Sequence, residues 1–147
     1  MENTSDREIV SIRVFNAPRE AVYRAWTEEE AVKKWWGPKG FVNIFEEFDP
    51  VPGGRWKFVM RGPDGRDYEN EIRFVELTPP ERIVLDHVSQ PRFVITAEFE
   101  ALPGNKTRLV WKAVFESAAV FKGLKDIATQ GTLENFDRLE AVLAART

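Results

Sequence analysis

The sequence predicts an α+β fold in which a seven-stranded antiparallel sheet wraps around one long C-terminal helix. Three observations lead to this prediction. A strand-like run near the N-terminus is followed by two short helical patterns. Six further runs rich in β-branched and aromatic residues follow, separated by regular turn signals. The last part of the sequence is a long stretch in which apolar residues recur at helical spacing.

The N-terminal part of the chain contains one predicted strand and two short predicted helices. Residues 9–15 mix apolar and polar positions in a β-branched run, which predicts the first strand. Pro18 then begins a helix, because its ring fixes φ near the helical value and its missing N–H is not needed there. Thr27 and Glu30 have the spacing of a capping box, which predicts that a second helix begins after Thr27. The Gly-Pro pair at 37–38 ends this helix.

Between residues 41 and 115 the sequence predicts six strands with short connections. Clusters of glycine, proline, asparagine and serine mark the turns between them. Strands joined by short turns pair as antiparallel neighbours, so these six form a meander and the first strand adds a seventh. The predicted strands are residues 41–49, 55–61, 66–77, 82–88, 92–102 and 107–115.

Alternation along these strands assigns their two faces. Successive side chains point to opposite sides of a sheet, and here one set is apolar or aromatic while the other is charged. We interpret the charged set, which includes Glu69, Glu98 and Arg108, as a solvent-exposed face. The apolar face includes Trp56, Phe58, Met60, Tyr68, Asn70, Ile72, Phe74, Ile83, Leu85, His87, Ile95, Ala97, Phe99, Leu109, Trp111 and Ala113.

The apolar face needs a cover, and the C-terminal stretch supplies one. Apolar residues recur at helical spacing from Leu124 to Leu143, which predicts a helix over residues 124–144. Such a helix is roughly 31 Å long, and a seven-stranded sheet is roughly 29 Å wide. One helix therefore crosses the whole sheet, and we expect residues 1–147 to form a single domain with an ordered core over roughly 8–145.

The composition excludes several classes of protein. The chain has 21 basic and 24 acidic residues, a net charge of -3 and no basic stripe, so we expect no nucleic-acid partner. It has no cysteine, which excludes thiolate nucleophiles, disulfides and cysteine-based zinc sites. No apolar window has the length of a signal-peptide core or of a membrane span, so we expect a cytoplasmic protein without a membrane span.

Four motifs resemble those of one known family. They are Phe15-Asn16-Ala17-Pro18-Arg19-Glu20-Ala21-Val22-Tyr23, Trp35-Trp36-Gly37-Pro38, Gly53-Gly54-Arg55-Trp56 and Pro79-Pro80-Glu81-Arg82. In this order they are similar to the homologues of the activator of the 90-kDa heat-shock-protein ATPase, within the START-like (SRPBCC) superfamily. The resemblance covers essentially the whole chain and implies the helix-grip fold, which has the architecture predicted above. The superfamily includes lipid and sterol carriers, hormone receptors and polyketide cyclases, so the resemblance does not imply one ligand.

The first functional hypothesis is a cavity between the sheet and the C-terminal helix that binds a small apolar or amphipathic molecule. Many large aromatic rings in a small domain suit such a cavity, although they also fill ordinary cores. Many relatives have Gly-Trp in the last helix where this chain has Gly131-Thr132, so a relative's ligand does not transfer. We expect the ligand to contact Trp56, Phe58, Met60, Tyr68, Asn70, Ile72, Phe74, His87, Ile95, Ala97, Phe99, Trp111, Ala128, Gly131 and Asn135.

The second hypothesis is an enzyme of the cyclase or hydrolase kind. His87 is the chain's one histidine, and an imidazole on the apolar face could act as a base together with Tyr68, Asn70 or Glu76. The alternative interpretation of His87 is a neutral core histidine that bonds to a backbone carbonyl, with its pKa lowered by burial. Glu76 points inward if no bulge interrupts its strand. Because a buried carboxylate without a partner is costly, Glu76 is then paired, protonated or shifted outward.

The third hypothesis is an interaction protein that engages a chaperone or another protein through its surface. Trp35 and Trp36 either plug the pair of short helices or close the cavity mouth. No phosphate-binding glycine loop, dinucleotide fingerprint or serine nucleophile motif occurs, so we expect no cofactor. One histidine and no cysteine lead us to expect no metal site.

Overall fold

The computed structural model describes residues 3–146 of the chain. Within them, seven strands and three helices occur in the predicted order, and every strand lies within one residue of its predicted bounds. The elements are β1 (Glu8–Phe15), α1 (Arg19–Thr27), α2 (Glu29–Trp35), β2 (Val42–Phe48), β3 (Arg55–Arg61), β4 (Asp67–Thr78), β5 (Arg82–His87), β6 (Phe93–Leu102), β7 (Lys106–Phe115) and α3 (Ala118–Ala145).

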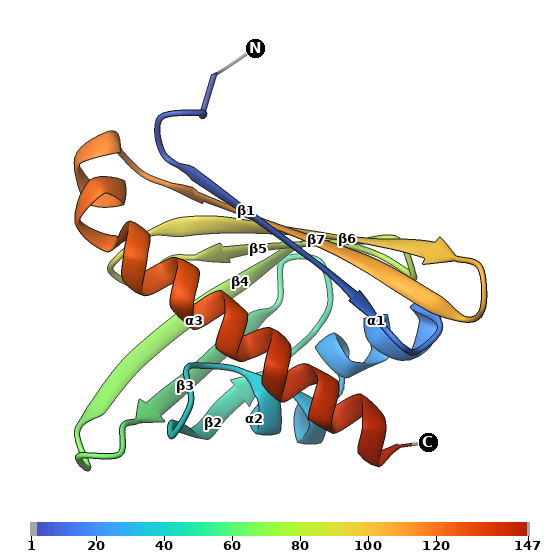
Figure 1. The fold of residues 1–147 in the computed structure, drawn as a ribbon. Helices are drawn as coiled ribbons and strands as arrows, with labels where there is room; N and C mark the ends of the chain where they lie inside the picture. Colours follow the sequence, from blue (N-terminus) through green and yellow to red (C-terminus); the bar gives the residue numbers. More distant parts are fainter. Residues whose placement is uncertain (1–2, 147) are drawn as a thin grey trace.

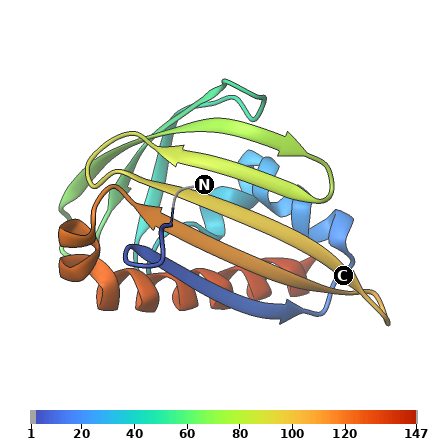
Figure 2. The same cartoon turned by 90° about the horizontal axis from the view of Figure 1, so that it is seen from above.

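The strands form one antiparallel sheet with the order β1-β7-β6-β5-β4-β3-β2. From β2 to β7 each strand pairs with its neighbours in sequence, and β1 pairs with β7 along its whole length. The sheet is strongly curved, and α3 crosses its concave side (Figure 1). Seen from above, α3 extends along the length of β1 and β7 (Figure 2). The predicted α+β helix-grip architecture is confirmed.

Helix α3 begins six residues earlier than the sequence analysis predicts, at Ala118 rather than at residue 124. Ser117 is its N-cap, and its Oγ accepts a hydrogen bond from the backbone N of Val120 at 3.2 Å. The prediction was wrong because it followed the apolar stripe and gave no weight to a serine that caps the helix before this stripe begins.

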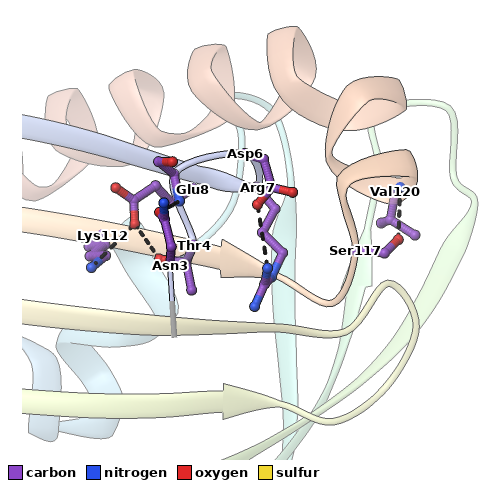
Figure 3. A network of polar contacts seen from close by, with 9 residues as sticks. Asn3, Thr4, Asp6, Arg7, Glu8, Lys112, Ser117 and Val120 are labelled. Atoms are coloured by element: carbon purple, nitrogen blue, oxygen red, sulfur yellow. Dashed lines mark hydrogen bonds and ion pairs between the residues drawn. The ribbon is translucent and has the colours of Figure 1, made fainter. Parts of the chain in front are cut away.

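A polar network fixes the start of β1 beside β7 (Figure 3). The carboxylate of Glu8 accepts a hydrogen bond from Thr4 Oγ1 at 2.6 Å and lies 3.3 Å from Lys112 Nζ of β7. The backbone N of Phe115 also donates to the carbonyl of Arg7 at 2.9 Å. The strand that leads into α3 is therefore held at its last residue, where α3 turns back under the sheet.

The predicted capping box between α1 and α2 does not form. Helix α1 extends through Thr27, whose Oγ1 donates to the carbonyl of Arg24 at 3.3 Å. Glu28 is the N-cap of α2, without a side-chain capping bond. Pro18 likewise stands at the N-cap of α1 rather than at its first helical position. In both cases the helix type and order are as predicted, and the boundary differs by one residue.

The five tryptophans form the centre of the core at one end of the concave face. Trp26 and Trp35 from the short helices, together with Trp36 just after α2, pack against the sheet residues Trp56 and Trp111. The indole N of Trp35 donates to the carbonyl of Ala25 at 2.8 Å. Trp35 is thus the plug of the helix pair, and this end of the sheet is filled by packed rings.

The Ser117 cap generates a stability prediction. We expect Ser117→Ala to lower the free energy of unfolding by about 0.5–2 kcal/mol, because the amide of Val120 loses its acceptor. Ser117→Asp is the control, since its carboxylate retains an acceptor at this position and should keep most of the stability. Urea unfolding measures both variants; equal stability of the alanine variant and the parent would show that the cap contributes nothing.

Candidate functional site: a cavity between the sheet and helix α3

A cavity of about 680 Å³ lies between the sheet and the middle part of α3, residues 124–135. Its sheet wall comes from the end of β3 and the start of β4, from the end of β5 and the start of β6, and from the end of β7. Because neighbouring strands are antiparallel, these segments all lie at the same end of the sheet. The cavity adjoins the tryptophan core, because Trp36 and Trp111 belong to both.

The cavity wall is mainly apolar. On the sheet side it includes Ile95, Trp111 and Phe115, and on the helix side Leu124 and Ala128. The other lining residues are Trp36, Gly37, Pro38, Phe41, Met60, Asp67, Tyr68, Glu69, Asn70, His87, Gln90, Pro91, Phe93, Ala113, Ile127, Gly131, Thr132 and Asn135. Two large apolar side chains of this set are strongly exposed, Ile127 at 73% and Tyr68 at 43%, so they mark the rim.

The structure divides the residues expected to contact a ligand into two groups. Met60, Tyr68, Asn70, His87, Ile95, Trp111, Ala128, Gly131 and Asn135 line the cavity. The remaining residues are buried in the packed core and do not line the cavity: Trp56, Phe58, Ile72, Phe74, Ala97 and Phe99. Alternation correctly places both groups on the concave face, but it carries no information about which end of that face the short helices fill.

Some lining residues were missed by the sequence analysis although a signal existed for them. Phe93 and Phe115 share the parity of Ile95 and Trp111 and could have been found by extending the same alternation to the strand ends. Thr132 was missed because it lies at the edge of the apolar stripe of α3. No comparable signal exists for Phe41 and the other loop residues, which are brought to the rim by the tertiary fold.

Gly131 faces open space on the cavity side of α3. A Cβ atom added at this position would meet no heavy atom within 4 Å. Glycine within a helix costs about 1 kcal/mol relative to alanine, and here no close approach of helix and sheet accounts for it. The space above Gly131 belongs to the cavity instead.

The loop after α2 forms one side of the cavity, and Arg138 of α3 holds it in place. One guanidinium nitrogen, Nη1, donates to the carbonyls of Trp36, Gly37 and Pro38 at 2.9–3.2 Å, and Nη2 donates to that of Phe41 at 3.4 Å. Burial lowers the pKa of Arg138 from its ordinary value, although the side chain remains a cation at neutral pH. Trp36, which closes this side of the cavity, is therefore tied directly to the helix.

His87 is buried in the cavity wall at the end of β5. Its ring stacks on Phe93, with ring centroids 4.4 Å apart. Its Nδ1 lies 2.9 Å from the carbonyl oxygens of both Ser89 and Pro91, so this nitrogen must carry a hydrogen. Burial lowers the pKa of His87 below its ordinary value, and the carbonyls of Pro91 and Ser89 offset this only in part. These contacts favour the interpretation of His87 as a neutral core histidine that bonds to backbone carbonyls.

The contact between His87 and Asn70 depends on the protonation of the ring. Nε2 lies 2.8 Å from Asn70 Oδ1, whereas Asn70 Nδ2 donates to the carbonyl of Tyr68 at 3.0 Å. A doubly protonated ring donates to Oδ1, but the neutral ring presents an acceptor at Nε2 and needs the amide turned by 180°. Burial favours the neutral ring. In the present orientation of the amide, two hydrogen-bond acceptors, Nε2 of this ring and Oδ1 of Asn70, therefore face each other.

The other two candidate catalytic residues do not converge on His87. Tyr68 lies at the rim, where its ring contacts Phe41. A bulge in β4 between Phe74 and Glu76 shifts the register and turns Glu76 to the outer face, where it lies 3.3 Å from Arg82. The structure therefore brings His87 and Asn70 together, without a carboxylate behind the imidazole.

Two general properties of the described residues complete the site. Among residues 3–146, no cluster of three or more His, Asp or Glu side chains has the arrangement of a metal site. No helix in this range is both long enough and apolar enough to cross a membrane.

Comparison with known proteins adds a family and a set of solved structures. The family model described as "Activator of Hsp90 ATPase homolog 1-like protein" matches residues 16–144. A search of curated proteins gives no match.

Several solved bacterial structures have the same fold. A solution structure from Arthrobacter aurescens has a TM-score of 0.88 at 22% identity, covering 99% of this chain and 90% of that one. The crystal structure of NE0264 from Nitrosomonas europaea has a TM-score of 0.88 at 22% identity, with all of both chains covered. CV1439 from Chromobacterium violaceum has a TM-score of 0.83 at 27% identity, covering 92% of this chain and 96% of that one. Similarity at this level supports the fold and no particular ligand.

An NMR titration tests whether burial lowers the pKa of His87. Because the chain has one histidine, its Cε1 proton gives a single titration curve by NMR. We expect the midpoint to lie below the ordinary value of about 6.5, because the charged ring is poorly solvated. A midpoint at or above the ordinary value would show that the carbonyl contacts outweigh burial.

The same shift has a consequence for stability. A folded-state pKa below the unfolded one means that the unfolded chain binds more protons as the pH falls through about 6.5. The contribution of His87 is therefore fully present above this pH and is lost as the pH falls. Urea unfolding at a series of pH values should show a shallower slope for His87→Gln than for the parent in this window.

Proposed function

The chain belongs to the family of Activator of Hsp90 ATPase homolog 1-like proteins, and we propose that it binds a small apolar or amphipathic molecule in the cavity beneath α3. The observation that carries the proposal is the cavity of about 680 Å³ between the sheet and the middle part of this helix. Pockets that bind small molecules generally have volumes of roughly 300–1,000 Å³ and mainly apolar walls.

The contrast between the two ends of the concave face supports this function. Protein interiors pack about as densely as organic crystals, and the end under α1 and α2 follows this rule. The other end has equally large side chains available in Trp111 and Phe115, yet it retains open space above Gly131. A shortage of large residues therefore does not explain the cavity.

The rim also suits an apolar ligand. Ile127 of α3 and Tyr68 of β4 present large apolar surfaces to solvent beside the cavity. Exposed apolar side chains that border a concave apolar wall are typical of ligand entrances. We infer that the ligand enters between the N-terminal half of α3 and the hairpin of β3 and β4.

The alternative functions have weaker support from the site. Acid–base catalysis would need a proton donor and a proton acceptor that converge on one point of the cavity, and of the four candidates only His87 and Asn70 do so. A chaperone or another protein as partner, and a cytoplasmic location, remain predictions from the sequence and the family.

Two glycines of α3 allow a matched test of the proposal. A Cβ atom would meet no heavy atom within 4 Å at either Gly123 or Gly131, but only Gly131 lines the cavity. We expect Gly131→Leu to fill the cavity and abolish binding of N-phenyl-1-naphthylamine, an uncharged dye that fluoresces in apolar surroundings. Its stability should stay level or rise by up to about 1 kcal/mol, because the helix gains propensity without a clash.

Gly123→Leu is the control, since it gains the same helix propensity on the exposed side and should bind the dye as the parent does. Urea unfolding and a fluorescence titration measure both variants. A loss of about 1–3 kcal/mol for Gly131→Leu, with no dye bound by the parent, would indicate an overpacked and closed core and would exclude the proposed function. Native mass spectrometry of protein purified from its own host would show a retained ligand directly.

A further inference from the structure

Asn135 has unused hydrogen-bonding capacity in the wall of the cavity. Its side chain is 8% exposed and lines the cavity, and its Oδ1 has no hydrogen-bond partner. It follows Gly131 by four residues and so lies on the same face of α3. A half-turn of the amide exchanges its donor and acceptor halves, so Asn135 can meet either kind of group on a ligand.

Other polar side chains of the wall already have partners in the protein. Thr132 Oγ1 donates to the carbonyl of Ala128 at 2.9 Å. Asn70 Nδ2 donates to the carbonyl of Tyr68 at 3.0 Å, and His87 Nδ1 is held by two backbone carbonyls. Asn135 therefore differs from Thr132, because its buried amide oxygen has no partner among the described residues, which is costly unless another group bonds to it.

The charges around the cavity discriminate against anionic ligands. Within the described residues that line it, the charged side chains are Asp67 and Glu69, both acidic. Asp67 lies 2.8 Å from Arg61, whereas Glu69 is exposed at the rim rather than confined to the outer face as alternation predicts. The nearby guanidinium of Arg138 is bonded to four backbone carbonyls. A carboxylate that entered the cavity would meet no free cation on its wall.

We propose that the ligand carries an uncharged hydrogen-bonding group, a hydroxyl or a carboxamide, on an apolar body, and that the side-chain amide of Asn135 binds this group. The inference rests on the proposed function and adds the chemical class of the ligand. The apolar body would lie against Ile95 and Trp111 of the sheet and Leu124 of the helix. Carboxylates of the same length are disfavoured, because burial of an unpaired charge costs more free energy than burial of a hydrogen-bonded uncharged group on the same apolar chain.

Three probes with the same ten-carbon chain test this inference: decanamide, 1-decanol and decanoate, the last at a pH where its carboxyl group is ionised. Tryptophan fluorescence follows their binding, since Trp36 and Trp111 line the cavity. We expect decanamide and 1-decanol to bind at least tenfold more tightly than decanoate. In ¹H–¹⁵N spectra, decanamide should shift the side-chain amide signal that is missing from Asn135→Leu.

Two variants separate the role of Asn135 from that of the cavity as a whole. Asn135→Leu replaces the amide with an apolar group of similar size and should weaken decanamide about tenfold, as expected for one lost hydrogen bond, while it still binds N-phenyl-1-naphthylamine. Gln130→Leu makes the same kind of change on the exposed side of α3, outside the cavity, and should leave both affinities unchanged.

The possible outcomes distinguish the inference from the proposed function. If decanoate binds as tightly as decanamide, or if Asn135→Leu binds decanamide as the parent does, the ligand class is wrong although the cavity still binds. If neither the dye nor any of the three probes binds the parent protein, the proposed function itself is wrong, and the inference fails with it.

Discussion

One geometric constraint determines the arrangement of the molecule: a single helix is too narrow to cover the whole concave face of a seven-stranded sheet. Such a sheet is roughly 29 Å wide, whereas a helix with its side chains covers a stripe about 10 Å across. Helix α3 has 28 residues and a length of about 42 Å, so it spans the face in one direction only. The apolar surface beside it must be covered by something else. At one end α1 and α2 supply that cover, and the cavity lies at the other end.

The same constraint explains what the sequence could and could not predict. Alternation identifies the concave face correctly, because Trp56 and Trp111 have the same parity, but it does not separate the packed end from the open end. Helices α1 and α2 fill the packed end, and their position on the sheet is set by long-range tertiary contacts that the local sequence does not show. A single bulge then reverses the parity of Glu76, since one extra residue turns every following side chain to the other face. Such a bulge has no clear signal in the local sequence.

The polar groups of the site show how tertiary contacts decide chemistry. The sequence places His87 on the apolar face, which is compatible with a general base or with a neutral core residue. The fold favours the neutral core residue, because the carbonyls of Ser89 and Pro91 in the loop after β5 both face Nδ1 and burial disfavours the charged ring. Likewise, Arg138 is an ordinary helix residue in the sequence, and only the fold shows that backbone carbonyls occupy its guanidinium. Among the described residues, the wall of the cavity therefore has no free positive charge.

Helix α3 contains two local features that reduce stability, and they occur four residues apart on the same face. Gly131 costs about 1 kcal/mol of helix propensity, and the unpartnered amide oxygen of Asn135 costs about 1–3 kcal/mol. Further along the helix, Phe136 and Leu139 are fully buried and well packed, so the helix as a whole is not loosely fitted to the sheet. Departures from good packing tend to be kept where function requires them. Both departures line the same cavity, which is why we propose that the space above Gly131 and the amide of Asn135 serve one ligand.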